Sequence, residues 1–184
     1  MKQLFSLLLL CCMNLVSAQR VESPTGTLAL TFQLTPDGQP TYAVSYKNKP
    51  VVLSSALGVS LKDKTALVNH FEVTGTTTHA VNETWKPVLG EQAQIVNHYN
   101  ELIVALVQKD SKVKLNLVFR AFDEGVAFRY DFPKQENLNY FIISDEKTEF
   151  NLTENNKVFW IPGDFDSNEY VYNETKFSEI DNEK

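Results

Sequence analysis

Three segments of this 184-residue sequence gather polar and aromatic side chains of the kinds that form binding and catalytic sites. They are residues 83–91 (ETWKPVLGE), 97–101 (NHYNE) and 160–170 (WIPGDFDSNEY). In the third, Asp164, Asp166 and Asn168 follow the alternating spacing of a calcium-binding loop. Glu169 stands where an EF-hand needs glycine, and Thr175 where it needs a bidentate glutamate, so the segment is not an EF-hand. What remains is a group of hard oxygen ligands, which suits calcium better than zinc.

Several other kinds of site are excluded by the residue types present. His70, His79 and His98 lack the spacing of metal ligands, and we interpret them as structural residues. The sequence contains neither a glycine-rich phosphate loop nor a G-x-S-x-G nucleophile motif. Both cysteines, Cys11 and Cys12, lie in an N-terminal leader, so thiol catalysis is excluded for the mature chain.

Residues 1–18 have the pattern of a secretory signal peptide. Lys2 supplies the positive charge, an apolar run extends from Leu4 to Val16, and Ala18 precedes the predicted cleavage site. The run is too short to span a bilayer, which takes about 20 residues. A lipid-modified cysteine is the alternative, but bulky leucines precede Cys11. We predict a mature chain of residues 19–184, exported to the periplasm or the extracellular space, with no membrane span.

Composition places the chain among globular proteins, since 43% of its residues are hydrophobic and 11% aromatic. The net charge of −6 is unevenly distributed: residues 121–184 contain 15 acidic and 6 basic residues. Because the sequence has no basic run, nucleic acids and anionic membrane surfaces are not expected partners. The acidic last third is either a solvated face or a site lined with carboxylates for a cation or a sugar.

The elements that must position these segments are strands. Apolar residues alternate with polar ones, as in Leu28, Leu30, Phe32 and Leu34, which predicts a half-buried strand. Strands are predicted at residues 27–34, 42–46, 102–107, 113–121, 126–132, 140–144 and 158–161, with turns at 36–38, 48–50 and 123–125. No window shows a capped helical pattern. The sequence therefore predicts an all-β fold, an antiparallel β-sandwich.

Taken in order, the motifs resemble one family. They are Ser23-Pro24, 40–47 (PTYAVSYK), 83–87 (ETWKP), 90–91 (GE), 97–102 (NHYNEL), 128–133 (FRYDFP), 160–164 (WIPGD) and 166–170 (DSNEY). The order and the residues resemble the N-terminal β-sandwich domain of glycoside hydrolase family 97, which includes secreted α-glucosidases and α-galactosidases. The resemblance covers essentially all of residues 19–184. Leu89 departs from it, because the family often has tryptophan there.

The resemblance implies a galactose-mutarotase-like supersandwich that precedes a (β/α)8 catalytic barrel. In the family the barrel supplies the catalytic acid and the nucleophile or base, and a calcium ion lies in the active site. Barrel glutamates and one glutamate of the N-terminal domain hold this ion, and the matching residue here is Glu169. By the same resemblance, Asp164 and Asp166 are expected to shape the loop, and no residue of this chain is expected to be catalytic.

Because these 184 residues do not include the barrel, two functions are weighed. The favoured one is a truncated, non-catalytic, carbohydrate-binding-type N-terminal region of a secreted calcium-dependent α-glycosidase, inactive alone and binding calcium weakly or not at all. Its partners are the missing barrel and, through the parent enzyme, an α-linked glucan or galactoside oligosaccharide. An α-glucosidase is favoured over an α-galactosidase, and the barrel decides between inversion and retention. The alternative is a free-standing exported carbohydrate-binding or adaptor module.

Overall fold

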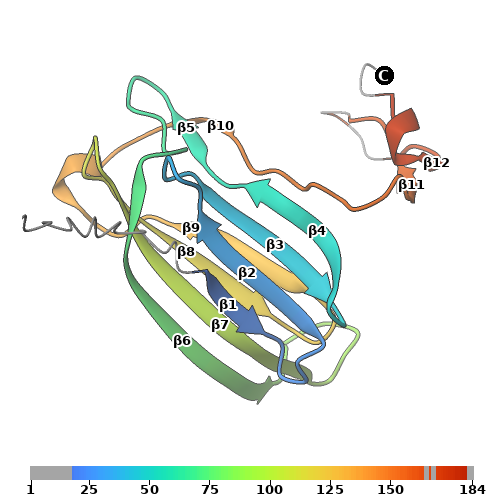
Figure 1. Cartoon of the computed structure of the whole chain (residues 1–184). Coiled ribbons are helices and arrows are strands. Elements are labelled where there is room, and N and C mark those ends of the chain that lie inside the picture. The colour runs from blue at the N-terminus through green and yellow to red at the C-terminus, as the bar shows by residue number, and fades with distance from the viewer. Residues whose placement is uncertain (1–17, 164–165, 167–168, 182–184) are drawn as a thin grey trace, which may run out of the picture.

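A computed structural model describes residues 18–163, 166 and 169–181 of the chain. Almost all regular structure in these residues is β-strand (Figure 1). The strands are β1 (Gln19–Glu22), β2 (Leu28–Leu34), β3 (Pro40–Tyr46), β4 (Lys49–Ala56), β5 (Val59–Leu61), β6 (Phe71–Trp85), β7 (Ile95–Gln108), β8 (Lys114–Ala121), β9 (Val126–Asp131), β10 (Ile143–Glu146), β11 (Lys157–Trp160) and β12 (Asn173–Lys176). Two 3-10 turns, η1 (Glu136–Leu138) and η2 (Phe177–Glu179), accompany them.

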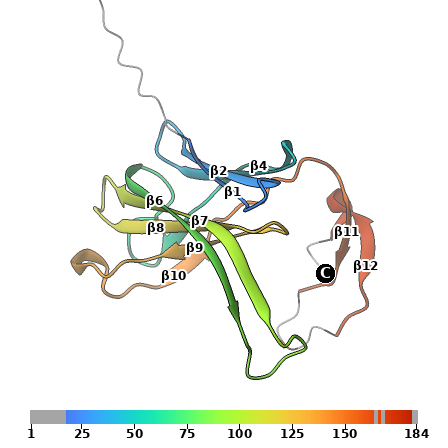
Figure 2. The same ribbon diagram turned by 90° about the horizontal axis from the view of Figure 1, so that it is seen from below.

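Two antiparallel four-stranded sheets pack face to face, as the edge-on view in Figure 2 shows. Their strand orders are β1-β2-β3-β4 and β6-β7-β8-β9. The apolar residues of each alternating strand point to the inner face of its sheet. Leu30 and Phe32 of β2 thus lie in one core with Leu117 and Phe119 of β8. The predicted all-β sandwich is confirmed.

Aromatic rings occupy the middle of the core. The ring centroids of Phe32 and Phe119 lie 5.9 Å apart, and Phe128 lies 6.2 Å from Phe119. Phe32 and Phe119 have no exposed surface. Burial of one such side chain stabilises the fold by about 1.5–3 kcal/mol, so the apolar alternation is what joins the two sheets.

Tyr130 of β9 connects the sandwich to the segment that carries β10. Its hydroxyl accepts a hydrogen bond from the Gly58 backbone N–H at 2.9 Å and lies 2.7 Å from the Thr148 hydroxyl. Burial raises the pKa of the Tyr130 hydroxyl above its usual value. The Tyr42 hydroxyl donates to the Glu149 carbonyl at 2.9 Å, so this segment is fastened at two places.

The predicted β2–β3 and β8–β9 hairpins are confirmed, with turns at residues 36–38 and 123–125. The second turn is tied to the other sheet, because Asp123 accepts hydrogen bonds from the Thr25 hydroxyl at 2.5 Å and the Thr25 N–H at 2.9 Å. These bonds, led by the one from the hydroxyl, hold the pKa of the Asp123 carboxyl below its usual value. Two pattern interpretations were wrong in detail. The turn predicted at 48–50 lies at Lys47 and Asn48, and the strand predicted at 140–144 begins only at Ile143.

Strands β6 and β7 form a long hairpin that the sequence pattern did not predict. Strand β7 pairs with β8 only as far as Asn100, so residues 81–99 extend beyond the sheet as a two-stranded ribbon, here called the β6–β7 arm (Figure 2). Residues 83–85 and 97–98 interrupt the apolar alternation because they lie on strands of the arm that have no core side, whereas residues 86–91 belong to its loop. Only residues 86–94 connect the strands as a loop. Among the described residues, no helix has the length and apolar character needed to cross a membrane.

Candidate functional site

The segment that contains Glu169 joins the two strands of the β11–β12 hairpin. Trp160, the last residue of β11, is paired with Asn173, the first residue of β12. The indole N–H of Trp160 donates to the Thr175 hydroxyl at 3.1 Å, and Lys157 forms an ion pair with Glu174. The tryptophan of the sequence motif therefore anchors the base of this connection.

Glu169 and Asp166 are both exposed within this connection. Asp164 and Asn168, the other members of the predicted oxygen group, lie outside the described residues, as does the predicted leader apart from Ala18. Among the described residues, no group of three histidine, cysteine or acidic side chains comes together in a way that holds a metal ion. Calcium takes six to eight oxygens, so this donor set fits a calcium ion only as one contributor to a site that is shared with other groups.

The first two candidate segments meet on the β6–β7 arm, where Glu83 is paired with Asn97. The Asn97 side-chain amide donates to the Glu83 carboxylate at 2.7 Å, and Trp85 is paired with Ile95. Half of the Trp85 surface is exposed, and Val88 at the tip is 99% exposed. The arm and the β11–β12 hairpin lie at opposite ends of the view in Figure 1, so the three segments do not form one described site.

A charged cluster lies on the outer side of the sheet where the arm joins it. The Arg120 guanidinium lies 2.7 Å from the Glu101 carboxylate and 4.5 Å from the centre of the Tyr99 ring. Phe122 packs against the same ring at an interplanar angle of 48°, with centroids 5.0 Å apart. The Glu101 side chain is 11% exposed. The sequence identified Glu101 within NHYNE but not its partner Arg120, which lies on the neighbouring strand β8.

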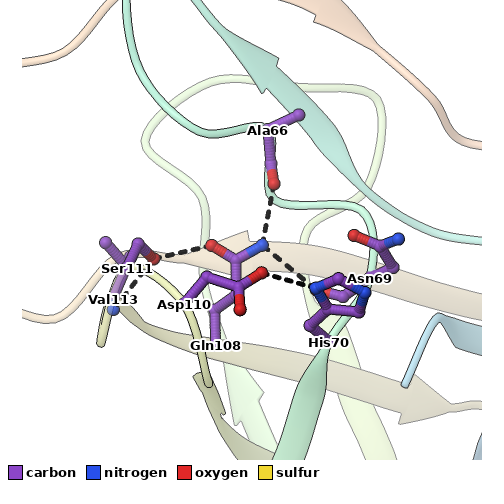
Figure 3. A network of polar contacts seen from close by, with 7 residues as sticks. All are labelled: Ala66, Asn69, His70, Gln108, Asp110, Ser111 and Val113. Atoms are coloured by element: carbon purple, nitrogen blue, oxygen red, sulfur yellow. Dashed lines mark hydrogen bonds and ion pairs between the residues drawn. The ribbon is translucent and has the colours of Figure 1, made fainter. Parts of the chain in front are cut away.

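A second polar network surrounds Gln108, which is fully buried at the end of β7 (Figure 3). Its side-chain amide donates to the carbonyls of Ala66 at 2.8 Å and Asn69 at 3.0 Å, and its carbonyl accepts from the Ser111 hydroxyl at 2.6 Å. Both polar atoms of the Gln108 side chain are thus hydrogen-bonded to the segments before β6 and after β7. The sequence contained one signal for this residue, since a glutamine follows Leu102, Val104 and Leu106 on their inward-facing side.

His70 lies beside this network, and its ring contacts an acidic side chain. Its Nδ1 atom lies 2.5 Å from the Asp110 carboxylate (Figure 3). Its backbone N–H donates to the Asp37 carbonyl, and its carbonyl accepts from the Lys109 N–H, both at 2.9 Å. The interpretation of His70 as a structural residue is consistent with these contacts. A pocket of about 240 Å³ lies nearby, lined by Leu61, Lys64, Thr65, Ser111, Val113, Asn137 and Leu138.

Comparison with known proteins identifies the relatives of this fold. The family model described as "Glycosyl-hydrolase 97 N-terminal" matches residues 21–184. A glycoside hydrolase family 97 enzyme from Pseudoalteromonas sp. strain K8, solved with panose and with acarbose, superposes with a TM-score of 0.79 at 34% identity. The match covers 85% of this chain and 24% of that enzyme.

Two further relatives carry other activities in their names. A retaining α-galactosidase of Bacteroides thetaiotaomicron is 28% identical over 134 residues, which is 71% of this chain and 19% of that protein. A β-arabinopyranosidase structure superposes with a TM-score of 0.71 at 26% identity, covering 78% of this chain and 23% of that one. The chain therefore spans a quarter or less of these relatives. It belongs to glycosyl-hydrolase family 97, and it corresponds to the N-terminal region of that family.

Proposed function

We propose that this chain is the non-catalytic N-terminal β-sandwich region of an exported, calcium-dependent α-glycosidase, and that it is inactive alone. The observation that carries the proposal is the match of the family's N-terminal region over residues 21–184, together with coverage of only 24% of a solved family enzyme. In the parent protein this region packs on the catalytic barrel and contributes one glutamate to a calcium site.

The chemistry of glycoside hydrolysis supports the absence of activity in this chain. The reaction needs two carboxyl groups on opposite sides of the scissile bond, separated by about 5–9.5 Å according to mechanism. Glu101, whose side chain is 11% exposed, instead forms an ion pair with Arg120 on the outer side of a sheet.

We propose an α-glucosidase rather than an α-galactosidase as the parent activity. The higher identity is to the enzyme solved with panose and acarbose, 34% against 28% for the retaining α-galactosidase. Panose is an oligosaccharide of α-linked glucose, and an α-linked glucan is the substrate class that we assign to the parent. The barrel sets the choice between inversion and retention.

Glu169 is the residue that we propose as the calcium ligand contributed by this chain. Its exposed position in the β11–β12 connection leaves it accessible to a neighbouring domain. A carboxylate offers at most two of the six to eight oxygens that calcium takes, so the chain alone binds calcium with a Kd on the order of millimolar or weaker. When bound, calcium polarises oxygens near it and makes neighbouring groups more acidic.

The first test is an activity assay on the purified chain with p-nitrophenyl α-glucoside and α-galactoside. We expect no turnover above a buffer blank, with or without added calcium. Turnover that survives repurification would contradict the non-catalytic role. Tight binding of a maltooligosaccharide by the isolated chain would instead favour a free-standing carbohydrate-binding module.

The second test is calorimetric titration of the chain with calcium. We expect no isotherm in the micromolar range, and the variants Glu169→Gln and Glu154→Gln should behave alike, because most ligands lie elsewhere. Glu154 is a matched control, since it is also exposed and acidic. Micromolar binding that Glu169→Gln abolishes and Glu154→Gln does not would show that this chain forms a calcium site by itself.

A further inference from the structure

Strand β6 forms one edge of its sheet and has a free side along most of its length. It spans 15 residues and pairs only with β7. The Phe71 N–H, at its start, donates to the Gly38 carbonyl at 3.0 Å. Beyond Phe71, within the part of the chain that the structure describes, no backbone hydrogen bond reaches the outer side of β6. A row of unpaired backbone groups is a template for another strand.

The other three edges of the two four-stranded sheets are protected by features that β6 lacks. Strand β4 contains Pro50 and is covered by residue Asn151, whose carbonyl accepts from the Leu53 N–H at 2.7 Å. Strand β1 has only four residues, and β9 carries Arg129 in the middle of six. Charges, prolines, covering segments and short length are the usual means of preventing edge pairing. Strand β6 has neither charge nor proline from residue 73 to residue 82.

Its one irregularity limits where a second strand can pair. A β-bulge lies between Val73 and Gly75, and the register with β7 is regular from Gly75 to Trp85. A bulge twists an edge away from a partner. The stretch available for regular pairing is therefore Gly75–Trp85, with a length on the order of 35 Å.

We propose that this stretch pairs with its counterpart in a second copy of the chain, antiparallel about a two-fold axis at Ala80. This register uses the whole regular stretch, placing Trp85 of one copy beside Gly75 of the other. It also places Glu83 opposite Thr77 and Thr84 opposite Thr76, so no like charges meet. Parallel pairing in register would put Glu83 opposite Glu83, which is unfavourable. The two-fold arrangement closes at a dimer and does not propagate.

Pairing of this kind also supports the β6–β7 arm. A two-stranded ribbon is marginally stable in water, and a third strand adds a second row of backbone hydrogen bonds. In the proposed register the arm half of β6 in one copy lies against the half of β6 that is backed by the sandwich in the other copy. The half-exposed Trp85 ring then covers a glycine. The inference stands apart from the proposed function, since it concerns no sugar and no calcium.

The test measures the mass of the full chain in solution by sedimentation. The chain carries Cys11→Ser and Cys12→Ser, so that no disulfide can link two copies. We expect a species of twice 20.9 kDa that dissociates on dilution. Ala80→Lys places two lysines together at the axis and should raise the dimer dissociation constant at least about fivefold. Ala127→Lys is the matched control, because Ala127 is also exposed on an edge strand of the same sheet. It should leave the dimer unchanged.

Cross-linking tests the register. Ala80→Cys, on the Cys11→Ser, Cys12→Ser background, should give a covalent dimer with a short bis-maleimide, whereas Ala127→Cys should not. A chain that stays monomeric throughout the accessible concentration range would overturn the proposal and leave the edge to a strand from elsewhere in a longer polypeptide. A dimer that Ala80→Lys does not weaken, or that both lysine variants weaken equally, would also overturn it. Matching circular dichroism and Tm values for the two lysine variants exclude unfolding as the cause.

Discussion

Gln108 offers the clearest test at the scale of a single residue. It is fully buried, and its side chain makes three hydrogen bonds to the segments on either side of it. Replacement by leucine keeps the volume approximately but removes the hydrogen-bond donors to the carbonyls of Ala66 and Asn69, two half-buried residues. We expect Gln108→Leu to lower the free energy of unfolding by about 1–3 kcal/mol, measured by urea denaturation.

The matched control for this prediction is Gln33→Leu. Gln33 is an exposed residue of β2, so its replacement should change the free energy of unfolding by no more than about 0.5 kcal/mol. Equal losses for the two variants would mean that the Gln108 network does not stabilise the fold.

The sequence predicted some functional residues but not the partners that they contact. Glu101 was selected from its motif, but its partner Arg120 comes from the neighbouring strand, 19 positions away. Gln108 bonds to residues 39 and 42 positions away. No local pattern encodes such pairs, because they form only once β7 has a register with β6 and β8. The assignment of Glu169 came from family resemblance and remains a proposal.

At the scale of an element, the β2–β3 hairpin can be tested by a substitution of Gly38 in its turn. Its φ is +79°, and a Cβ atom there would lie 2.7 Å from the Phe71 backbone nitrogen. An L-residue therefore meets both an unfavourable conformation and a clash with backbone that cannot move freely. We expect Gly38→Ala to lower the free energy of unfolding by about 2 kcal/mol or more, measured by urea denaturation.

Gly125, in the β8–β9 turn, is the control for this substitution. A Cβ atom there would have no neighbour within 4 Å, and we expect Gly125→Ala to change the stability by no more than about 0.5 kcal/mol. If the two alanine variants were equally stable, close packing of the first turn against Phe71 would not be what requires glycine there.

A hairpin was predictable where its own sequence contains both the alternating apolar face of its strands and the residues of its turn. The β2–β3 and β8–β9 hairpins combine alternating apolar residues with turn residues such as Asp37 and Gly38, and both form. Strand β6 has no such alternation, because most of its residues are exposed on both sides. It is a strand through its pairing with β7, which is a property of two segments and not of one.

Hydrogen exchange provides the test at the scale of the whole molecule. Strands β11 and β12 bond to each other and not to the sandwich within the described part of the chain, as in the pair formed by Lys157 and Glu174. The strands of the sandwich instead bury a shared core. We expect amides of β11 and β12 to exchange at least about a hundredfold faster than those of β8, measured by mass spectrometry. Equal protection would show that the hairpin unfolds only with the sandwich.

The sequence by itself determined the fold class, the main hairpins and the family, because alternation, turn chemistry and motifs are local properties of the chain. The family match over residues 21–184 bears out that assignment. The tertiary structure decided which side chains meet and which surfaces stay open. The Gln108 network, the Arg120–Glu101 pair and the free edge of β6 all depend on the register between strands distant in sequence. Register is set by packing of the whole core, where one position of slip would turn every inward side chain outward.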